Sequence, residues 1–165
     1  MAKKDFPELH TQKISHLRQR EIQASVAACL IKRFEKTLGK EKAIKEATAA
    51  IALDSKKAGS IIAKNYGGNT IFELGRLMRE IWSDDNALTV DVLEETTQKF
   101  CFNVTRCKYV EMYEKMGIRD LGFCLSCSRD AAFIEGFNPK MKLSRTQTIM
   151  EGATHCDFRI SLEEK

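Results

Sequence analysis

The sequence predicts an α+β protein in which a helical N-terminal half packs with a C-terminal antiparallel sheet that carries inserted helices. Two observations support this class: apolar residues recur at helical spacing through residues 14–82, and after residue 87 they alternate with polar ones. A chain of 165 residues suits one domain with its own core. We therefore expect a single domain over residues 1–165, with a mainly helical part at 1–86 and a sheet-containing part at 87–165.

The helical half divides at glycine-containing breaks. Gly39 and the stretch NYGGNT at 65–70 interrupt the helical pattern, and Thr70 is placed to cap the next helix, with Glu73 at the capping-box position. The first helix carries an apolar face formed by Ile22, Val26, Cys29, Leu30 and Phe34. Because a free cysteine on such a face behaves as a small hydrophobe, we expect Cys29 to lie in the core.

The second half mixes strands with short helices. Apolar and polar residues alternate in LTVDVLEE (88–95) and in KFCFNVTR (99–106), which is typical of half-buried strands. Helical spacing returns in CKYVEMYEKMG (107–117), and a second short helix is expected within GFCLSCSRDAAFIEGFNP (122–139). The closing segment 141–161 predicts two strands joined by a turn.

Composition and charge limit the function classes. The 43% hydrophobic and 30% charged residues are typical of a soluble globular protein, and no apolar stretch approaches the length of a membrane span. The start, MAKKDFPELHTQK, lacks the apolar run of a secretory signal, so we expect a cytoplasmic protein without a membrane partner. The net charge of +4 comes from basic residues interleaved with acidic ones, so we expect a solvated surface and no nucleic acid partner.

The six cysteines are expected to be free thiols, metal ligands or catalytic groups, because disulfides are rare in a reducing compartment. Cys107 lies between Arg106 and Lys108 at a predicted helix start, a setting that favours the thiolate. We therefore expect Cys107 or Cys127 to be alkylated faster than Cys29.

Cys124, Cys127 and Asp130 are spaced three apart, so on a helix they share one side. A carboxylate one turn from a thiol is costly to bury unless it binds something, which makes Cys127 and Asp130 candidates for a site, whereas Cys124 fits simple packing. A zinc site would need further ligands from Cys107, Cys156 or His155, and none of these forms a second paired knuckle.

Several motifs occur in one order: an Arg-Cys before a Tyr-bearing helix, a Cys-x-x-Asp, an Asn-Pro followed by Arg-Thr-x-Thr, and a Gly-x-x-x-Cys-Asp-Phe strand. They lie in FNVTRCKYVEMYEKMGIRDLG (102–122) and CSRDAAFIEGFNPKMKLSRTQTIMEGATHCDFRI (127–160). Over residues 102–160 the chain resembles the L-2-amino-thiazoline-4-carboxylic acid hydrolase family. The resemblance implies hydrolytic opening of a cyclic amidine at a carbon–nitrogen bond.

The resemblance also implies roles for particular residues. Cys127, or alternatively Cys107, would supply the nucleophile, and Asp130 would hold the amidinium. His155 would deliver the proton and Arg145 would bind the substrate carboxylate. The ordinary alternatives are an exposed residue beside a turn for His155, a sheet-surface charge for Arg145 and simple packing for Cys156. Cys156 lies in a shared motif and is a further substrate-binding candidate. We expect no cofactor and no metal.

A second function class stays open at this point. Cys107, Cys127, Cys156 and Asp130 would also suit a non-catalytic sensor that binds a ligand or a metal ion. Metal content of the purified protein separates the metal-binding version from thiol chemistry. The natural substrate and the oligomeric state are left open by the sequence.

Overall fold

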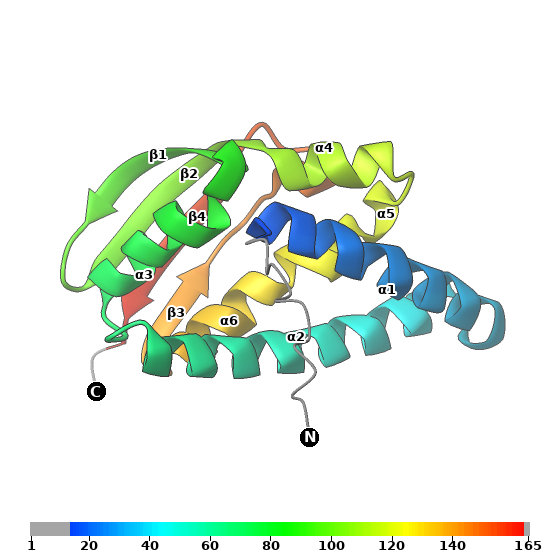
Figure 1. Ribbon diagram of the computed structural model, residues 1–165, viewed down its shortest axis with the longest axis horizontal. Coiled ribbons are helices and arrows are strands. Elements are labelled where there is room, and N and C mark those ends of the chain that lie inside the picture. The colour runs from blue at the N-terminus through cyan, green and yellow to red at the C-terminus, as the bar shows by residue number, and fades with distance from the viewer. Residues whose placement is uncertain (1–13, 164–165) are drawn as a thin grey trace, which may run out of the picture.

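The structure is a computed structural model that describes residues 14–163. It begins with two long helices, α1 (His16–Leu38) and α2 (Lys40–Asn65), which lie side by side in opposite directions (Figure 1). They join at Gly39, whose φ of 81° belongs to the left-handed region that glycine adopts without strain. None of the helices within 14–163 is long and apolar enough to cross a membrane.

A compact helical segment connects this hairpin to the sheet. It consists of α3 (Ile71–Leu77), a π-helical turn η1 (Met78–Trp82) and a 3₁₀ turn η2 (Asp84–Asn86). The predicted capping box at the start of α3 is confirmed. The Thr70 side chain accepts from the backbone N–H of Glu73, and the Glu73 carboxylate accepts from the backbone N–H of Thr70.

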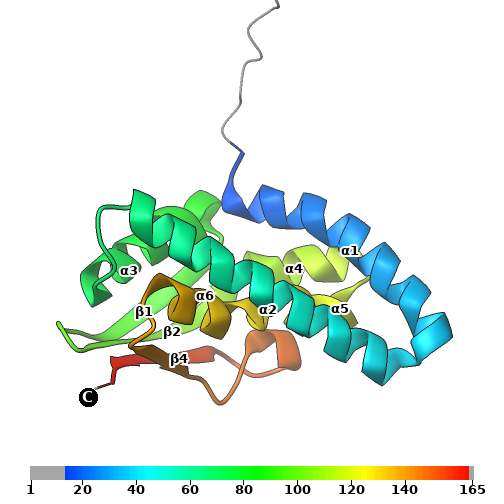
Figure 2. The same ribbon diagram turned by 90° about the horizontal axis from the view of Figure 1, so that it is seen from below.

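The second half forms one antiparallel sheet of four strands in the order β1-β2-β4-β3. The strands are β1 (Leu88–Glu95), β2 (Lys99–Cys107), β3 (Met141–Ser144) and β4 (Cys156–Leu162). Alternate residues of β2 and β4 point into the core, and the helices pack over this face of the sheet (Figure 2). The predicted α+β class is therefore confirmed.

Short helices are inserted between β2 and β3, and one 3₁₀ turn lies before β4. The elements are α4 (Lys108–Lys115), α5 (Arg119–Gly122), the π-helical turn η3 (Phe123–Cys127), α6 (Arg129–Phe137) and η4 (Ile149–Glu151). The expected single short helix around the Cys-x-x-Cys motif is thus divided by a π-helical turn. Such a turn changes the angular spacing of side chains, so Cys124, which packs in the core, no longer shares one side with Cys127 and Asp130.

The apolar face predicted for α1 points outward. Large side chains that the sequence pattern assigns to one apolar face are exposed, namely Ile22, Val26, Leu30 and Phe34. The prediction that Cys29 lies in the core is wrong, because its thiol is also exposed. The buried face of α1 is instead formed by Ala24, Ala28 and Ile31, whose mostly small side chains let the helix approach its neighbours closely.

Helices α2 and α6 cross at unusually short range. A Cβ atom added at Gly136 would lie 2.0 Å from the carbonyl oxygen of Lys56, and one added at Gly59 would lie 2.2 Å from the carbonyl oxygen of Phe133. At the same crossing the buried Ser55 hydroxyl donates a hydrogen bond to the carbonyl oxygen of Arg129 (2.9 Å). Two glycines and one serine therefore set the position of α6.

We expect Gly136→Ala to lower the free energy of unfolding by roughly 2 kcal/mol or more, because the added methyl group meets backbone atoms that cannot move independently. Gly68→Ala is the matched control, since its added Cβ would meet only the flexible Glu73 side chain. Urea unfolding of both variants measures the difference. Equal stabilities would show that the close crossing is not a constraint.

Candidate functional site

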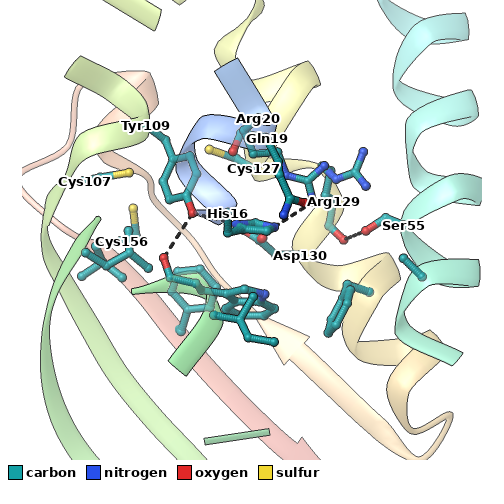
Figure 3. A pocket seen from close by; sticks show the side chains of 18 of the residues that line it. His16, Gln19, Arg20, Ser55, Cys107, Tyr109, Cys127, Arg129, Asp130 and Cys156 are labelled. Atoms are coloured by element: carbon teal, nitrogen blue, oxygen red, sulfur yellow. Dashed lines mark hydrogen bonds between the residues drawn. The ribbon is translucent and has the colours of Figure 1, made fainter. Parts of the chain in front are cut away.

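A cavity of about 360 Å³ lies between the first turns of α1, the middle of α2, the start of α6 and the inner face of the sheet (Figure 3). Its walls come from segments far apart in the sequence, from His16 to Phe158. The volume falls in the range of pockets that bind small molecules, about 300–1,000 Å³. We refer to this cavity as the pocket.

The pocket gathers most of the residues that the sequence analysis singled out. The ones that line it are Cys107, Cys127, Asp130, Arg145 and Cys156. His155 is not among its lining residues; its ring lies beside the Gln147 amide (2.9 Å) and the Thr154 hydroxyl (3.2 Å). The expected role of His155 in proton delivery is therefore not supported. Cys124 packs in the core, with its thiol toward the carbonyl oxygen of Ile44.

Asp130 and Arg145 form an ion pair at the wall of the pocket. Arg145 Nη1 donates to Asp130 Oδ2 (2.6 Å), and Nη2 donates to the carbonyl oxygen of Cys127 (2.9 Å). The Arg145 side chain is 10% accessible and that of Asp130 is 25% accessible. Arg145 is therefore committed to protein partners, whereas the carboxylate of Asp130 still faces the pocket.

Asp130 and Arg145 each affect the pKa of the other. Burial raises the pKa of the Asp130 carboxyl group, and the guanidinium of Arg145 opposes that rise. Burial lowers the pKa of Arg145, but the neighbouring carboxylate more than offsets this, so its pKa lies above the ordinary value. The pKa of Asp130 stays above its ordinary value despite Arg145, whose 2.6 Å contact is the interaction that favours the ionised carboxylate.

The pocket thiols are neutral rather than activated. Burial raises the pKa of Cys107 to about 11, although backbone N–H groups at the start of α4 act in the opposite direction. Burial and the nearby Asp130 raise the pKa of Cys127. The pKa of Cys156 is also raised by burial, and its sulfur accepts a hydrogen bond from the backbone N–H of Ile149 (3.2 Å). The expectation that the setting of Cys107 favours the thiolate is wrong, because burial outweighs the backbone N–H groups.

A hydrogen-bonded chain crosses the pocket from α1 to η1. The Tyr109 hydroxyl donates to the carbonyl oxygen of Trp82 (3.1 Å), so its oxygen accepts from His16 Nδ1 (2.8 Å). His16 Nε2 then accepts from Arg20 Nη2 (3.1 Å). This order assigns His16 the neutral tautomer with the proton on Nδ1. Burial and then Arg20 lower the pKa of His16 to about 3, in agreement with a neutral ring.

Positive charge exceeds negative charge around the pocket. Three arginines and two aspartates line it, which are Arg20, Arg129, Arg145, Asp54 and Asp130. Arg129 Nη2 donates to Asp54 Oδ2 (2.9 Å). The Arg129 side chain of this pair is largely buried, whereas that of Asp54 is exposed to solvent. With His16 neutral, the lining carries one net positive charge, which favours a ligand that bears an anionic group.

Sequence reasoning missed His16, Arg20, Arg129 and Tyr109 as residues of the site. His16 and Arg20 are four residues apart on α1, a spacing that places them on one helix face but does not predict what that face meets. The buried Tyr109 carried a weak signal, because a buried phenol needs a hydrogen-bond partner. Their role depends on how α1 lies against the sheet.

Within residues 14–163, no group of three or more His, Cys, Asp or Glu side chains is arranged to hold a metal ion. The pocket thiols and Asp130 therefore do not form the ion site that the metal-sensor alternative requires. All six cysteines are free.

Fold and pocket together define a class: an α+β protein with one antiparallel sheet, helices over one face of it, and a pocket between the two layers. Within this class the chain belongs to the L-2-amino-thiazoline-4-carboxylic acid hydrolase family, whose sequence profile matches residues 19–160. The match extends beyond the motif region 102–160 into the helical half. No relative is found among curated protein sequences.

One solved structure shares the fold at low sequence identity. The phenol-responsive sensory domain of the transcription activator PoxR, solved with phenol, is 14% identical with a TM-score of 0.52, covering 84% of this chain and 73% of its own. A trafficking protein particle complex subunit 3 from Naegleria fowleri, covalently bound to palmitic acid, is 11% identical with a TM-score of 0.48, covering 88% of this chain and 96% of its own. The similarity to the PoxR domain concerns the fold alone.

The structure reverses the order of thiol reactivity expected from the sequence. We expect brief iodoacetamide treatment to modify Cys29 well before Cys107 and Cys127, because Cys29 is exposed while burial raises the pKa of the other two. Peptide mass spectrometry measures the order, and the same treatment in denaturant is the control, in which the differences should largely disappear. Faster modification of Cys107 in the folded protein would contradict the neutral-thiol assignment.

Proposed function

We propose that this protein is a small-molecule hydrolase that opens a cyclic amidine carrying a carboxylate, and that it acts in the cytoplasm, where free thiols persist. One observation carries the proposal: the Asp130 carboxylate is paired with Arg145 and faces a pocket that also contains the thiols of Cys107 and Cys127. Family membership supports the same class of reaction.

The arrangement suggests how such a substrate would bind. The amidinium would donate hydrogen bonds to the carboxylate of Asp130, which has only one oxygen engaged by Arg145. Because Arg145 already binds Asp130 and the carbonyl oxygen of Cys127, it is poorly placed to bind the substrate carboxylate. We assign that role to Arg20, whose side-chain partners His16 and Gln23 are neutral, and to Arg129, whose ion-pair partner Asp54 is exposed to solvent.

Cys107 is the better of the two nucleophile candidates. Its thiolate is supported by the N-terminus of α4, whereas Cys127 lies beside the negative charge of Asp130. A bound amidinium adds positive charge to the pocket and would lower the pKa of the thiol that attacks. Sulfur would then add to the amidine carbon, the thiol proton would pass to the ring nitrogen, and the carbon–nitrogen bond would break. Water would release the product from sulfur and restore the thiol.

A non-catalytic ligand-binding sensor is the second candidate. The observation that favours it is that none of the three pocket thiols has a lowered pKa, so the pocket is suited to binding more than to reaction. A sensor would bind cyclic amidines without turning them over, and this outcome separates the two candidates.

Replacing the two thiols one at a time tests the chemistry. We expect Cys107→Ser to reduce turnover of a cyclic amidine carboxylate by at least about a thousandfold with little change in binding, because an alcohol lacks the accessible anion of a thiol. Cys127→Ser should retain most of the activity. Product formation and calorimetric binding should be measured on both variants. Full activity in Cys107→Ser would transfer the role to Cys127 or to a bound water.

Asp130→Asn tests the amidinium site. We expect affinity to fall at least about tenfold, since the change removes a charged hydrogen bond worth roughly 1.5–3 kcal/mol. The variant also leaves Arg145 without its ion pair, so binding must be measured at a temperature where the variant is folded. Glu135→Gln, on the same helix as Asp130, is the matched control, because it removes an exposed ion pair with Lys56 of α2. Unchanged affinity in Asp130→Asn would exclude the proposed contact.

A further inference from the structure

The walls of the pocket are of two kinds. The polar wall is formed by charged side chains from the first turns of α1 and the start of α6, together with Asp54 of α2 and Arg145 after β3, which pair with the residues of α6. The other wall is apolar and consists of Ala58, Ile62, Trp82, Val104, Phe133 and Phe158. We call this second region the apolar chamber. Helix α6 links the two regions, since Phe133 follows Asp130 by three residues and so lies one turn further along the helix.

The side chains of the apolar chamber are held in place by their packing. All of its residues belong to, or pack against, one core cluster that includes the inner face of the sheet. The rings of Trp82 and Phe133 meet edge to face, with centroids 5.4 Å apart and planes at 70°. The Phe158 ring stacks on Phe102 at 4.7 Å and carries the Arg145 guanidinium above it at 4.9 Å. Such packing preserves the shape of the chamber.

A bare thiazoline carboxylate would leave this chamber empty. Its amidinium and carboxylate are both satisfied at the polar wall, and a single five-membered ring is small beside a cavity of about 360 Å³. Apolar walls left in contact with water oppose binding, whereas a ligand group that covers them gains affinity in proportion to the area buried. Aromatic edges and faces in the chamber favour an aromatic group.

We infer that the substrate is a cyclic amidine carboxylate that carries an aryl substituent on its ring, with the substituent seated in the apolar chamber. This inference rests on the proposed function for the polar end of the ligand. It adds a specificity site formed by Trp82, Phe133 and Ala58, which lie on three different elements and converge on one space.

The test compares two ligands on the full chain by calorimetry: L-2-amino-thiazoline-4-carboxylic acid and the same compound with a phenyl group on the ring carbon next to sulfur. We expect the phenyl compound to bind at least about tenfold more tightly, because a fully buried phenyl group gains that much or more. Equal or weaker binding of the phenyl compound would overturn the inference.

Filling the chamber should remove this preference. Ala58→Leu places a larger side chain in the chamber, and we expect it to weaken binding of the phenyl compound about tenfold while leaving the unsubstituted compound nearly unchanged. Ala50→Leu, at an exposed position of the same helix, is the matched control. Trp82→Leu is a second variant that removes the aromatic edge without overfilling, and it should also reduce the preference. If both chamber variants kept the full preference for the phenyl compound, the placement of the aryl group in the apolar chamber would be contradicted.

Turnover measured on the same ligands keeps the two proposals separate. Tighter binding of the phenyl compound without turnover of either ligand would support the apolar chamber and contradict the hydrolase. Turnover of the unsubstituted compound with no preference for phenyl would support the hydrolase and contradict the chamber.

Discussion

The close crossing of α2 and α6 is the constraint on which the rest of the site depends. Gly59 and Gly136 allow backbone to meet backbone, and the Ser55 hydroxyl binds the carbonyl oxygen of Arg129 at the start of α6. Helix α6 carries Asp130 toward the polar end of the pocket and Phe133 toward the apolar chamber. A small shift of this helix would therefore move both ends of the ligand site together, because one rigid element supports them.

Burial decides the electrostatic state of the pocket. A carboxylate removed from water is costly unless it is paired, and Arg145 supplies the partner that favours the charged form of Asp130. Arg145 also favours the Cys127 thiolate, but burial and Asp130 outweigh it, and burial likewise raises the pKa of Cys107. The same low-polarity setting keeps His16 neutral and orders its hydrogen-bonded chain to Tyr109. A cationic ligand group would supply the charge that the thiols lack.

Some parts of the site could be predicted from local sequence and others could not. The motif region placed Cys127 and Asp130 near one another. Both line one pocket in the structure, together with Cys107, Arg145 and Cys156. The pairing of Arg145 with Asp130 was not predictable, because it joins a helix to the segment that follows β3. The thiolate expected at Cys107 failed because flanking charges in the sequence say nothing about how deeply a side chain is buried.

The sequence by itself determined the elements that depend on short-range periodicity and capping. Strand β1, the alternation of β2 and the capping box at Thr70 all follow from residues a few positions apart. Only the tertiary structure decided which face of α1 is buried, because an apolar periodicity marks a face without naming its partner, and Ala24 and Ala28 fit the close contact better than Val26 and Leu30. The same long-range packing brings His16 and Arg20 to the pocket, since their contacts lie with segments distant in the chain.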